Sequence, residues 1–435
     1  MNIGKYIFAQ VIDFIPRYQF DKLVKKYKGD WHAKDLSCYS QLLHLLFGQI
    51  TGCVSIRDIC LCLEAHGSSI YHLGIRKSVN QSNLCRANEK RDYRIYEGLG
   101  MYLISIVRPM YSNTKVTEIT IDNVLYALDS TTISTSIVLA AWALGKYSKG
   151  AVKMHTLLDL RGSIPANIHI TDGKWHDSNE LDEIVPEAFA FYMMDKAYVD
   201  FIALFRFHKA GAYWISRPKD NMRYEVVNHR LDFDPSTGIC GDFIIKLTTH
   251  KSKKLYPEPI RMVTYHDSVT GNDVEFITNN FEISAIEVTN LYRHRWDIEV
   301  FFKWIKQNIV VKNLWGYSEN AVRTHLWVAI IAYLIIAKIK ADYKSPYSIT
   351  EVATLIRISA LERVDLRDLI TKPKDSIIQN QFASVVCGYR VNELPIREKQ
   401  PGHDFRRRHS LASTLLSLHQ NEVVERSVSV TMAWP

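Results

Sequence analysis

The sequence lacks any segment that predicts a membrane span or a secretion signal. Its longest apolar run, residues 326–337, is shorter than the roughly 20 residues needed to cross a bilayer. The N-terminus, MNIGKYIFAQ, contains no long apolar core of the kind found in signal peptides. We therefore expect the apolar run to be a buried helix, and the protein to be cytoplasmic with no membrane partner.

Cysteine is scarce and irregularly placed. The seven cysteines are an odd number, and Cys60, Cys62 and Cys85 have no matching second pair that would complete a zinc site. The pattern GxxxxGK[ST], which cradles nucleotide phosphates, is also missing. These absences favour reduced core cysteines and predict neither a zinc site nor an ATP site.

The composition is otherwise that of an ordinary soluble protein. The 435 residues exceed what one simple core contains, so we expect two or three domains. Hydrophobic residues make up 47% of the chain and charged residues 23%, as in most globular proteins. The net charge of +8 suits a polyanionic partner, but many enzymes are equally basic.

One stretch, residues 291–306 (LYRHRWDIEVFFKWIK), combines an apolar face with a charged face. It contains no proline or glycine and its apolar residues do not alternate, so we predict one helix. The apolar face consists of Ile298, Phe301 and Ile305, at the spacing of a helix stripe that faces a core. At about 100° per residue, a single arc of roughly 60° contains Tyr292, Arg295, Glu299 and Lys306. A solvated face with chance ion pairs is the alternative interpretation.

The first part of the chain, residues 1–112, predicts a helical domain. Residues 6–15, 40–50 and 55–63 place apolar side chains at helical spacing. Residues 78–96 begin with serine and asparagine residues, which are typical of a helix start, and continue as a basic helix that carries Arg86, Lys90 and Arg91. A short helix, a turn and a basic helix are consistent with helix-turn-helix DNA binding. A solvated amphipathic helix is the alternative.

The middle of the chain changes to strands that alternate with helices. The predicted helices cover residues 179–189, capped by Ser178, and residues 200–209. The predicted strands cover residues 124–132, 151–160, 164–170, 190–194 and 212–216. Three strands, a helix, a strand, a helix and a strand follow in that order. This is the order of an RNase H-like α/β fold, in which helices flank a mixed sheet.

Two aspartates follow strands that we expect to be neighbours in this sheet. Asp129 ends the first strand and Asp195 ends the fourth, so their side chains should meet, with Glu299 as a third carboxylate. Two Mg²⁺ ions about 4 Å apart need oxygen ligands of this kind. One ion activates the attacking water or 3′-hydroxyl, and the other stabilises the leaving oxygen. Taken alone, an aspartate at a strand end is more often a turn or cap residue.

The spacing Tyr-x2-Arg-x3-Glu-x6-Lys within residues 291–306 resembles the signature of the IS4-family DDE transposases. Asp129, in the sequence LDST, resembles the first aspartate of that family. Asp195 resembles the second, in the pattern Asp-x2-Tyr-x-Asp that ends at Asp200. Three motifs in the family's order favour the catalytic interpretation over the alternatives for each residue alone.

The resemblance implies a transposase of an insertion sequence in the bacterial nucleoid. Such a protein binds element ends in double-stranded DNA, cuts them by metal-dependent hydrolysis and joins the 3′-hydroxyl ends to target DNA, as a homodimer in a synaptic complex. The implied catalytic carboxylates, which hold two Mg²⁺ ions for which Mn²⁺ can substitute, are Asp129, Asp195 and Glu299. The implied phosphate contacts are Tyr292, Arg295 and Lys306. The helical N-terminal domain would read the element ends.

Residues 221–285 predict a β-rich insertion between two segments of the core, 113–220 and 286–345. Strand-like runs at 224–228, 241–247, 259–265 and 273–278 are separated by turn sequences. The basic residues that could line a DNA groove, or lie on a solvated surface, are Lys246, Lys251, Lys253, Lys254 and Arg261. The C-terminal region, 346–435, contains a basic cluster at 406–409 that could contact DNA or belong to a disordered tail.

Two other functions remain compatible with these patterns. A catalytically inactive relative would bind DNA without cutting it, and an RNase H-fold nuclease would cut DNA without joining ends. Other side chains near the predicted strands are expected to have supporting roles. His176 and Asp177 resemble a His-Asp pair of the same family, and the resemblance implies a structural or supporting role for them. His155 and His169 alternate with apolar residues and are expected to be packed or hydrogen-bonded.

Overall fold

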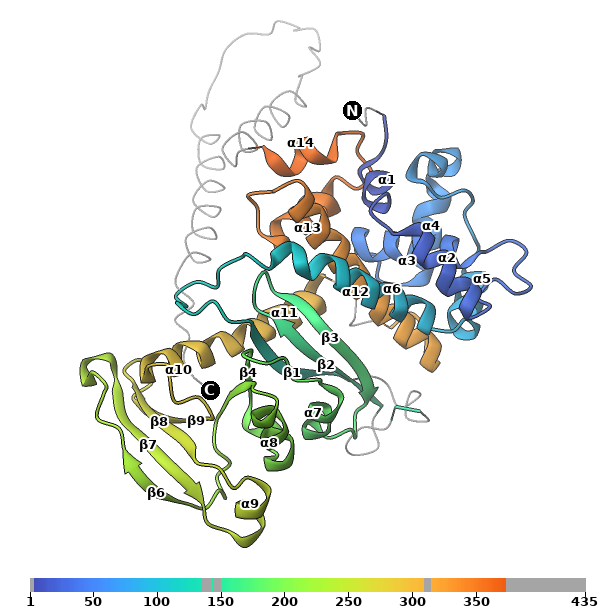
Figure 1. The fold of residues 1–435 in the computed structure, drawn as a ribbon. Helices are drawn as coiled ribbons and strands as arrows, with labels where there is room; N and C mark the ends of the chain where they lie inside the picture. The colour runs from blue at the N-terminus through green and yellow to red at the C-terminus, as the bar shows by residue number, and fades with distance from the viewer. Residues whose placement is uncertain (1–3, 135–141, 144–149, 309–313, 373–435) are drawn as a thin grey trace, which may run out of the picture. The chain divides into compact units, whose positions relative to one another are not determined.

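The computed structural model describes residues 4–134, 142–143, 150–308 and 314–372 (Figure 1). Nearly all of these residues belong to one compact unit, made of residues 1–266 and 273–372. The basic cluster predicted at 406–409 lies outside the described residues.

Six α-helices form the described N-terminal part of the chain. They are α1 Ile7–Ile12, α2 Arg17–Lys26, α3 Cys38–Thr51, α4 Ile56–Ala65, α5 Gln81–Lys90 and α6 Arg94–Val107. Side-chain oxygens of Ser37, Ser55 and Asn80 accept hydrogen bonds from backbone N–H groups in the first turns of α3, α4 and α5. The predicted helical character of this region is confirmed.

The connection between α4 and α5 differs from a helix-turn-helix unit. That motif joins its helices by a turn of about three or four residues. Here α4 ends at Ala65, α5 begins at Gln81, and a 3-10 helix, Gly67–Leu73, lies between them. The short turn expected from the sequence is therefore wrong, although the basic helix itself is present.

Nine strands of the described chain form one mixed sheet. In chain order they are β1 Leu125–Ser134, β2 Ala151–Asp159, β3 Ile164–Asp172, β4 Phe191–Met194, β5 Tyr213–Ser216, β6 Tyr224–His229, β7 Ile239–Leu247, β8 Ile260–Asp267 and β9 Asn272–Thr278. Their spatial order is β3-β2-β1-β4-β5-β9-β8-β7-β6. The first three strands are antiparallel, whereas β4 and β5 run parallel to β1. This is the predicted RNase H-like arrangement.

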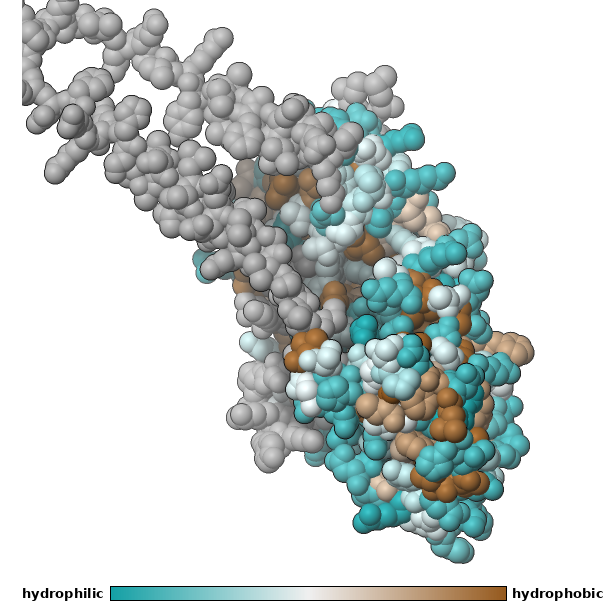
Figure 2. All heavy atoms as spheres, turned by 90° about the vertical axis from the view of Figure 1, so that its left-hand side faces the viewer, coloured by the Kyte–Doolittle hydropathy of each residue, from teal (hydrophilic) through white to brown (hydrophobic). Residues whose placement is uncertain are grey.

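The predicted β-rich segment extends the same sheet. β9 pairs antiparallel with β5 through Ile215 and Thr278, and β8, β7 and β6 follow outward. The outermost strand, β6, has exposed side chains along its whole length. Figure 2 shows hydrophobic residues, in brown, on the lower part of the molecule in that view. On β6 the side chains of Val226 and Val227 are exposed.

Helices cover both faces of the central strands (Figure 1). On one face, alternate residues such as Leu128 and Met194 pack in a buried cluster with side chains of α7 Glu180–Glu183 and α8 Phe201–Lys209. Because side chains alternate along a strand, Ala127 and Met193 point to the opposite face. That face is contacted by α10 Ala285–Arg293 and α11 Asp297–Asn308.

The helix predicted over residues 179–189 is much shorter in the structure. α7 ends at Glu183, and Ile184 already has an extended backbone with φ −92° and ψ 125°. Pro186 has no N–H to donate and disfavours a helical conformation at the preceding residue, so the helix cannot continue. Ser178 lies inside a 3-10 helix, Asp177–Asn179, and does not cap α7.

The prediction of a single helix over residues 291–306 is also wrong. α10 ends at Arg293, a 3-10 helix covers His294–Trp296, and α11 starts at Asp297. The His294 ring holds this junction, because its Nδ1 lies 3.0 Å from Asp297 Oδ2 and its Nε2 lies 3.0 Å from the carbonyl oxygen of Thr117. These contacts fix the position of the junction between the two helices.

The longest helix, α12 Glu319–Asp342, is the predicted buried helix. Ser318 caps its first turn, and it packs against α3, α5 and α6. Among the described residues it is the one single helix that is long and apolar enough to cross a membrane, but 89% of its apolar window is buried within the protein. Two shorter helices follow, α13 Ile349–Ile358 and α14 Leu366–Thr371.

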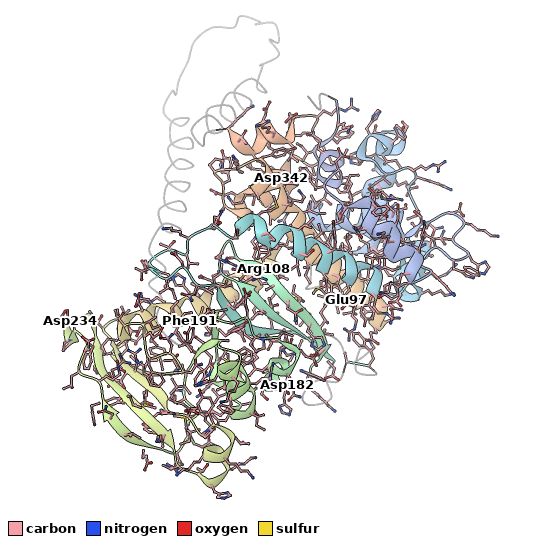
Figure 3. The ribbon with its side chains drawn as sticks, in the orientation of Figure 1. Glu97, Arg108, Asp182, Phe191, Asp234 and Asp342 are labelled. Atoms are coloured by element: carbon pink, nitrogen blue, oxygen red, sulfur yellow. The ribbon has the colours of Figure 1, made fainter. Side chains whose placement is uncertain are left out.

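An arginine ties the helical N-terminal part to the sheet. Figure 3 locates Arg108 where α6 ends beside the strands. Its Nε donates to Asp159 Oδ2 at 2.8 Å, and Arg161 Nη2 donates to the same oxygen at 2.7 Å. Asp159 is 1% exposed, so the two guanidinium groups neutralise a buried carboxylate at the end of β2.

The basic residues of the β6–β9 segment divide into two groups. The exposed ones are Lys246 on β7 and Lys251, Lys253 and Lys254 on α9 His250–Leu255. Arg261 is buried instead: its Nη2 lies 2.7 Å from Asp242 Oδ2, and both side chains are 1% exposed. The prediction that Arg261 lines a DNA groove is therefore wrong, because a buried carboxylate already binds its guanidinium group.

Replacing Arg261 with alanine should lower the free energy of unfolding by up to about 3 to 5 kcal/mol, because the buried Asp242 would lose its two short hydrogen bonds and keep only the longer ion pair with Arg230, whose Nε lies 3.6 Å from Asp242 Oδ2. Urea unfolding followed by circular dichroism measures the change. The matched control is Lys246→Ala, which removes an exposed cation from the neighbouring strand and should change the free energy of unfolding by less than about 0.5 kcal/mol. An Arg261→Ala protein as stable as the wild type would contradict this account of the buried pair.

Candidate active site

Strand pairing brings two of the predicted carboxylates together. β1 and β4 are parallel neighbours in which Leu128 is paired with Met194, so Asp129 and Asp195 are the next residues on adjacent strands. Both continue the set of alternate side chains that faces α10 and α11. β4 ends just before Asp195, as predicted, but Asp129 does not end its strand, because β1 continues to Ser134.

Arg295 joins the third carboxylate to this pair. Its Nη1 donates to Asp129 Oδ2 at 3.3 Å and its Nη2 donates to Glu299 Oε1 at 2.9 Å. The side chains of Arg295, Asp129 and Glu299 are 12%, 22% and 34% exposed, respectively. One guanidinium group therefore connects carboxylates from β1 and α11, which are far apart in the sequence.

Tyr292 packs beside this arginine. It is buried, its ring centroid lies 4.9 Å from that of Phe276, and the guanidinium carbon of Arg295 lies 5.8 Å from the tyrosine ring. Burial raises the pKa of Tyr292 to about 12, and the carboxylate of Asp195 adds to this rise. Tyr292 is thus neutral at physiological pH and braces one side of Arg295.

The electrostatics of Asp129 reflect its crowded position. Burial raises its pKa to about 6, and the negative charges of Glu299 and Asp195 act in the same direction. The N–H of Ser130, which donates to Asp129 Oδ1 at 2.7 Å, and the charge of Arg295 oppose the rise. The charges of both other carboxylates therefore raise the pKa of Asp129, as expected if the three share one site.

Carboxylate oxygens are the ligands that Mg²⁺ and Mn²⁺ prefer, so this donor set fits a divalent cation. A desolvated aspartate among like charges is also stabilised by added positive charge. In the structure Arg295 supplies that charge to Asp129 and Glu299. Within the described ranges, no three His, Cys, Asp or Glu side chains already lie in the arrangement that holds an ion.

A polar network supports Asp129 from the other face of the sheet. Asp177 Oδ1 accepts a hydrogen bond from Ser130 Oγ at 2.7 Å and one from Lys153 Nζ at 3.0 Å. His155 Nε2 lies 3.0 Å from Thr171 Oγ1, as a hydrogen-bonded histidine. Asp177 thereby holds the residue whose N–H contacts Asp129, which matches its predicted supporting role.

Sequence reasoning did not identify Ser130 or Lys153 as parts of this network. Antiparallel pairing sets Ser130 opposite His155 and Thr132 opposite Lys153, which directs these side chains toward Asp177. Only the register between β1 and β2 creates this arrangement, and the sequence of either strand alone contains no signal for it.

The remaining predicted DNA contacts lie at different places. Lys306 is exposed on α11, and Arg86 and Lys90 are exposed on α5. Arg91 points inward: its Nη1 donates to Gln41 Oε1 at 2.7 Å, and its side chain is only 10% exposed. The structure therefore argues against the predicted DNA contact of Arg91, because its donors bind neighbouring backbone and side-chain oxygens.

Two family models match the sequence. The model described as Transposase DDE domain matches residues 122–335, and the model described as Domain of unknown function (DUF4372) matches residues 3–76. All three carboxylates of the site lie within the first match.

Curated relatives point to the same class. The chain is 32% identical to "Putative transposase y4zB" of Sinorhizobium fredii over 49% of the chain and 60% of that protein. It is 32% identical to "Probable transposase for insertion sequence element IS5377" of Geobacillus stearothermophilus over 49% of the chain and 55% of that protein. It is 25% identical to "Putative transposase for insertion sequence element IS4SA" of Synechocystis over 60% of the chain and 72% of that protein. The chain thus spans little more than half the length of the first two relatives.

The fold and the acidic cluster define an RNase H-like domain with carboxylates gathered on one face of its sheet. The match over residues 122–335 identifies this region as a transposase DDE domain, and over about half of its length the chain is similar to insertion-sequence transposases.

Asp129→Asn should stabilise the metal-free protein at neutral pH. Because the folded-state pKa of Asp129 is raised to about 6, the wild type loses stability as the pH rises from about 4 through 6 and this carboxyl group ionises. The asparagine variant has no such loss, so it should be more stable by on the order of 1 to 3 kcal/mol at pH 7.5, and no more stable near pH 4.

Thermal unfolding without divalent cations measures this difference at both pH values. Asp122→Asn is the control, since Asp122 is exposed just before β1 and its substitution should have no effect at either pH. A variant at position 129 that is less stable than the wild type at pH 7.5 would show that the burial penalty is not the dominant effect.

Proposed function

We propose that this protein is an IS4-type insertion-sequence transposase that binds element ends, cuts them and joins their 3′-hydroxyl groups to target DNA. The observation that supports the proposal most directly is the contact of Arg295 with both Asp129 and Glu299, beside the strand position of Asp195. This contact and the strand pairing support one site for three acidic residues from distant segments of the transposase DDE domain.

The three carboxylates would hold two divalent cations, Mg²⁺ or Mn²⁺, through their oxygen atoms. Bound there, the cations would lower the pKa of the attacking water or hydroxyl and stabilise the leaving 3′-oxygen. Asp129 is held by the N–H of Ser130, and Asp195 is fixed by its place at the end of β4. The sheet therefore orients two ligands, and α11 brings Glu299 to them.

The basic residues of the signature would bind the DNA backbone. Arg295 presents several N–H donors and can grip a phosphate bidentately, whereas Lys306 offers a point charge from the exposed side of α11. Tyr292 is buried against Phe276. We therefore propose that it positions Arg295, and that only the edge of the tyrosine ring contacts DNA.

Partners follow from this chemistry. The substrates would be double-stranded DNA at the element ends and at the target, and two copies of the chain would act on paired ends in a synaptic complex. The helical N-terminal domain would bind the element ends, with Arg86 and Lys90 as candidate contacts. The site of action would be the bacterial cytoplasm, at the nucleoid.

Alanine at position 129, 195 or 299 should abolish Mg²⁺-dependent cleavage of DNA that carries the sequences bordering the gene, by at least about a thousandfold, because each removes a metal ligand. Binding of the same DNA should persist, since the phosphate contacts remain. Gel analysis of nicked strands measures cleavage, and fluorescence anisotropy measures binding.

Asp122→Ala is the matched control, an exposed aspartate on the same segment, and should cleave like the wild type. Full cleavage by a triad variant would remove that residue from the site. A wild-type protein that cuts these ends but never joins them to target DNA would instead indicate a nuclease on the same fold.

Arg295→Ala and Lys306→Ala should each weaken DNA binding and reduce the steepness of its salt dependence by about one unit in log–log slope, as expected when one phosphate contact is lost. Anisotropy titrations between low and moderate salt provide the slope. Lys303→Ala, an exposed lysine of α11 outside the signature spacing, is the control. Unchanged slopes for both signature variants would make these residues ordinary surface charges.

A further inference from the structure

The loop between α2 and α3 exposes a tryptophan on a constrained backbone. Trp31 is 72% exposed and its ring centroid lies 5.3 Å from that of His32, in a T-shaped contact. Lys28 and His32 have positive φ angles of 52° and 61°, which residues other than glycine seldom adopt. A strained backbone that presents a large aromatic ring to solvent is costly, which points to a binding role.

Arg91 donates hydrogen bonds to backbone oxygens at both ends of this loop. Its Nε donates to the carbonyl oxygen of Gly29 at 3.2 Å, and its Nη2 donates to the carbonyl oxygen of Leu36 at the other end of the loop. Asp30 Oδ1 also accepts a hydrogen bond from the N–H of Cys38 at 2.6 Å. Both ends of the loop are therefore fixed, so Trp31 is presented in a preorganised position.

A cavity of about 650 Å³ lies between this loop and α5. Besides Arg91, four cations line it: Lys28 and Lys34 from the loop, and Arg86 and Lys90 from the helix. Within the part of the chain that the structure describes, none of the four has an ion-pair partner within 4.0 Å.

The acidic residues at this cavity do not neutralise those four cations. Asp35 lies 3.7 Å from Lys77, and Asp92 lies 2.5 Å from Arg94. Lys34 also lines a second cavity, of about 770 Å³, on whose wall lies the exposed Arg76. Lys34 thus belongs to both cavities, and the exposed indole of Trp31 lines the first of them.

We propose that the loop of residues 27–36 and α5 together form a DNA-binding site that Trp31 completes. The four cations bind phosphates of the DNA backbone, and the indole packs against a base or sugar of the same DNA. Clustered unpaired cations favour a polyanion, whereas a protein partner would more often meet an apolar or mixed patch. This inference rests on the proposed transposase function and locates its end-binding surface in the loop and α5, in place of a helix-turn-helix.

The test measures binding of the full chain to fluorescent duplexes that carry the sequences bordering the gene, with a random duplex beside them. Trp31→Ala should weaken binding roughly tenfold, because burial of a large apolar side chain against the DNA stabilises the complex by about this factor or more. Tyr71→Ala is the matched control: Tyr71 is 73% exposed, lies beside the His72 ring at 6.0 Å and lines neither cavity. It should bind like the wild type.

The charged side of the site is tested in the same assay. Lys34→Ala and Arg86→Ala should each reduce the salt dependence of binding by about one unit of log–log slope. Lys25→Ala, which removes an exposed lysine of α2 outside both cavities, should leave the slope unchanged. All of these side chains are exposed, so the variants should keep the wild-type thermal unfolding temperature.

Two kinds of failure can be distinguished. If the wild type binds and cleaves the bordering DNA but Trp31→Ala, Lys34→Ala and Arg86→Ala bind it equally well, the loop site is overturned while the proposed function stands. If the wild type binds no duplex at all, both proposals are overturned. Weaker binding by these three variants together with unchanged Tyr71→Ala and Lys25→Ala proteins would support the site.

Discussion

Three carboxylates in a partly buried site repel one another, and Arg295 is the cation that offsets this repulsion in the protein. It contacts Asp129 and Glu299 from the junction between α10 and α11. The sheet supplies the second constraint, because the parallel pairing of β1 with β4 places Asp195 beside Asp129. The strands, the helix junction and the arginine must therefore all be present for one acidic site to exist.

Arginine has two different uses in this chain. Arg91, Arg108 and Arg261 are turned toward carboxylates or backbone oxygens and hold distant segments together. The net charge of +8 therefore does not measure the positive charge available to a polyanion. Among the described residues, the exposed cations, which include those on α5, α9 and α11 and in the loop of residues 27–36, are available to DNA phosphates.

Much of the fold could be predicted from the sequence because the relevant signals are local. Apolar alternation and turn residues identified the strands, and the buried run became α12. The errors have local or distant causes. Pro186 ends α7 early, and the 3-10 helix His294–Trp296 interrupts the helix that residue types alone favoured. At this junction His294 contacts Thr117, a residue more than a hundred positions away.

The sequence by itself determined which residues are chemically able to form the site, since the types and spacing of Asp129, Asp195 and Glu299 are written along the chain. Only the tertiary structure decided which side chains neutralise or support them. Arg295 could have been a solvated charge, and Ser130 and Asp177 meet only through strand register. Electrostatic partners are chosen by distance in space, which local sequence patterns do not encode.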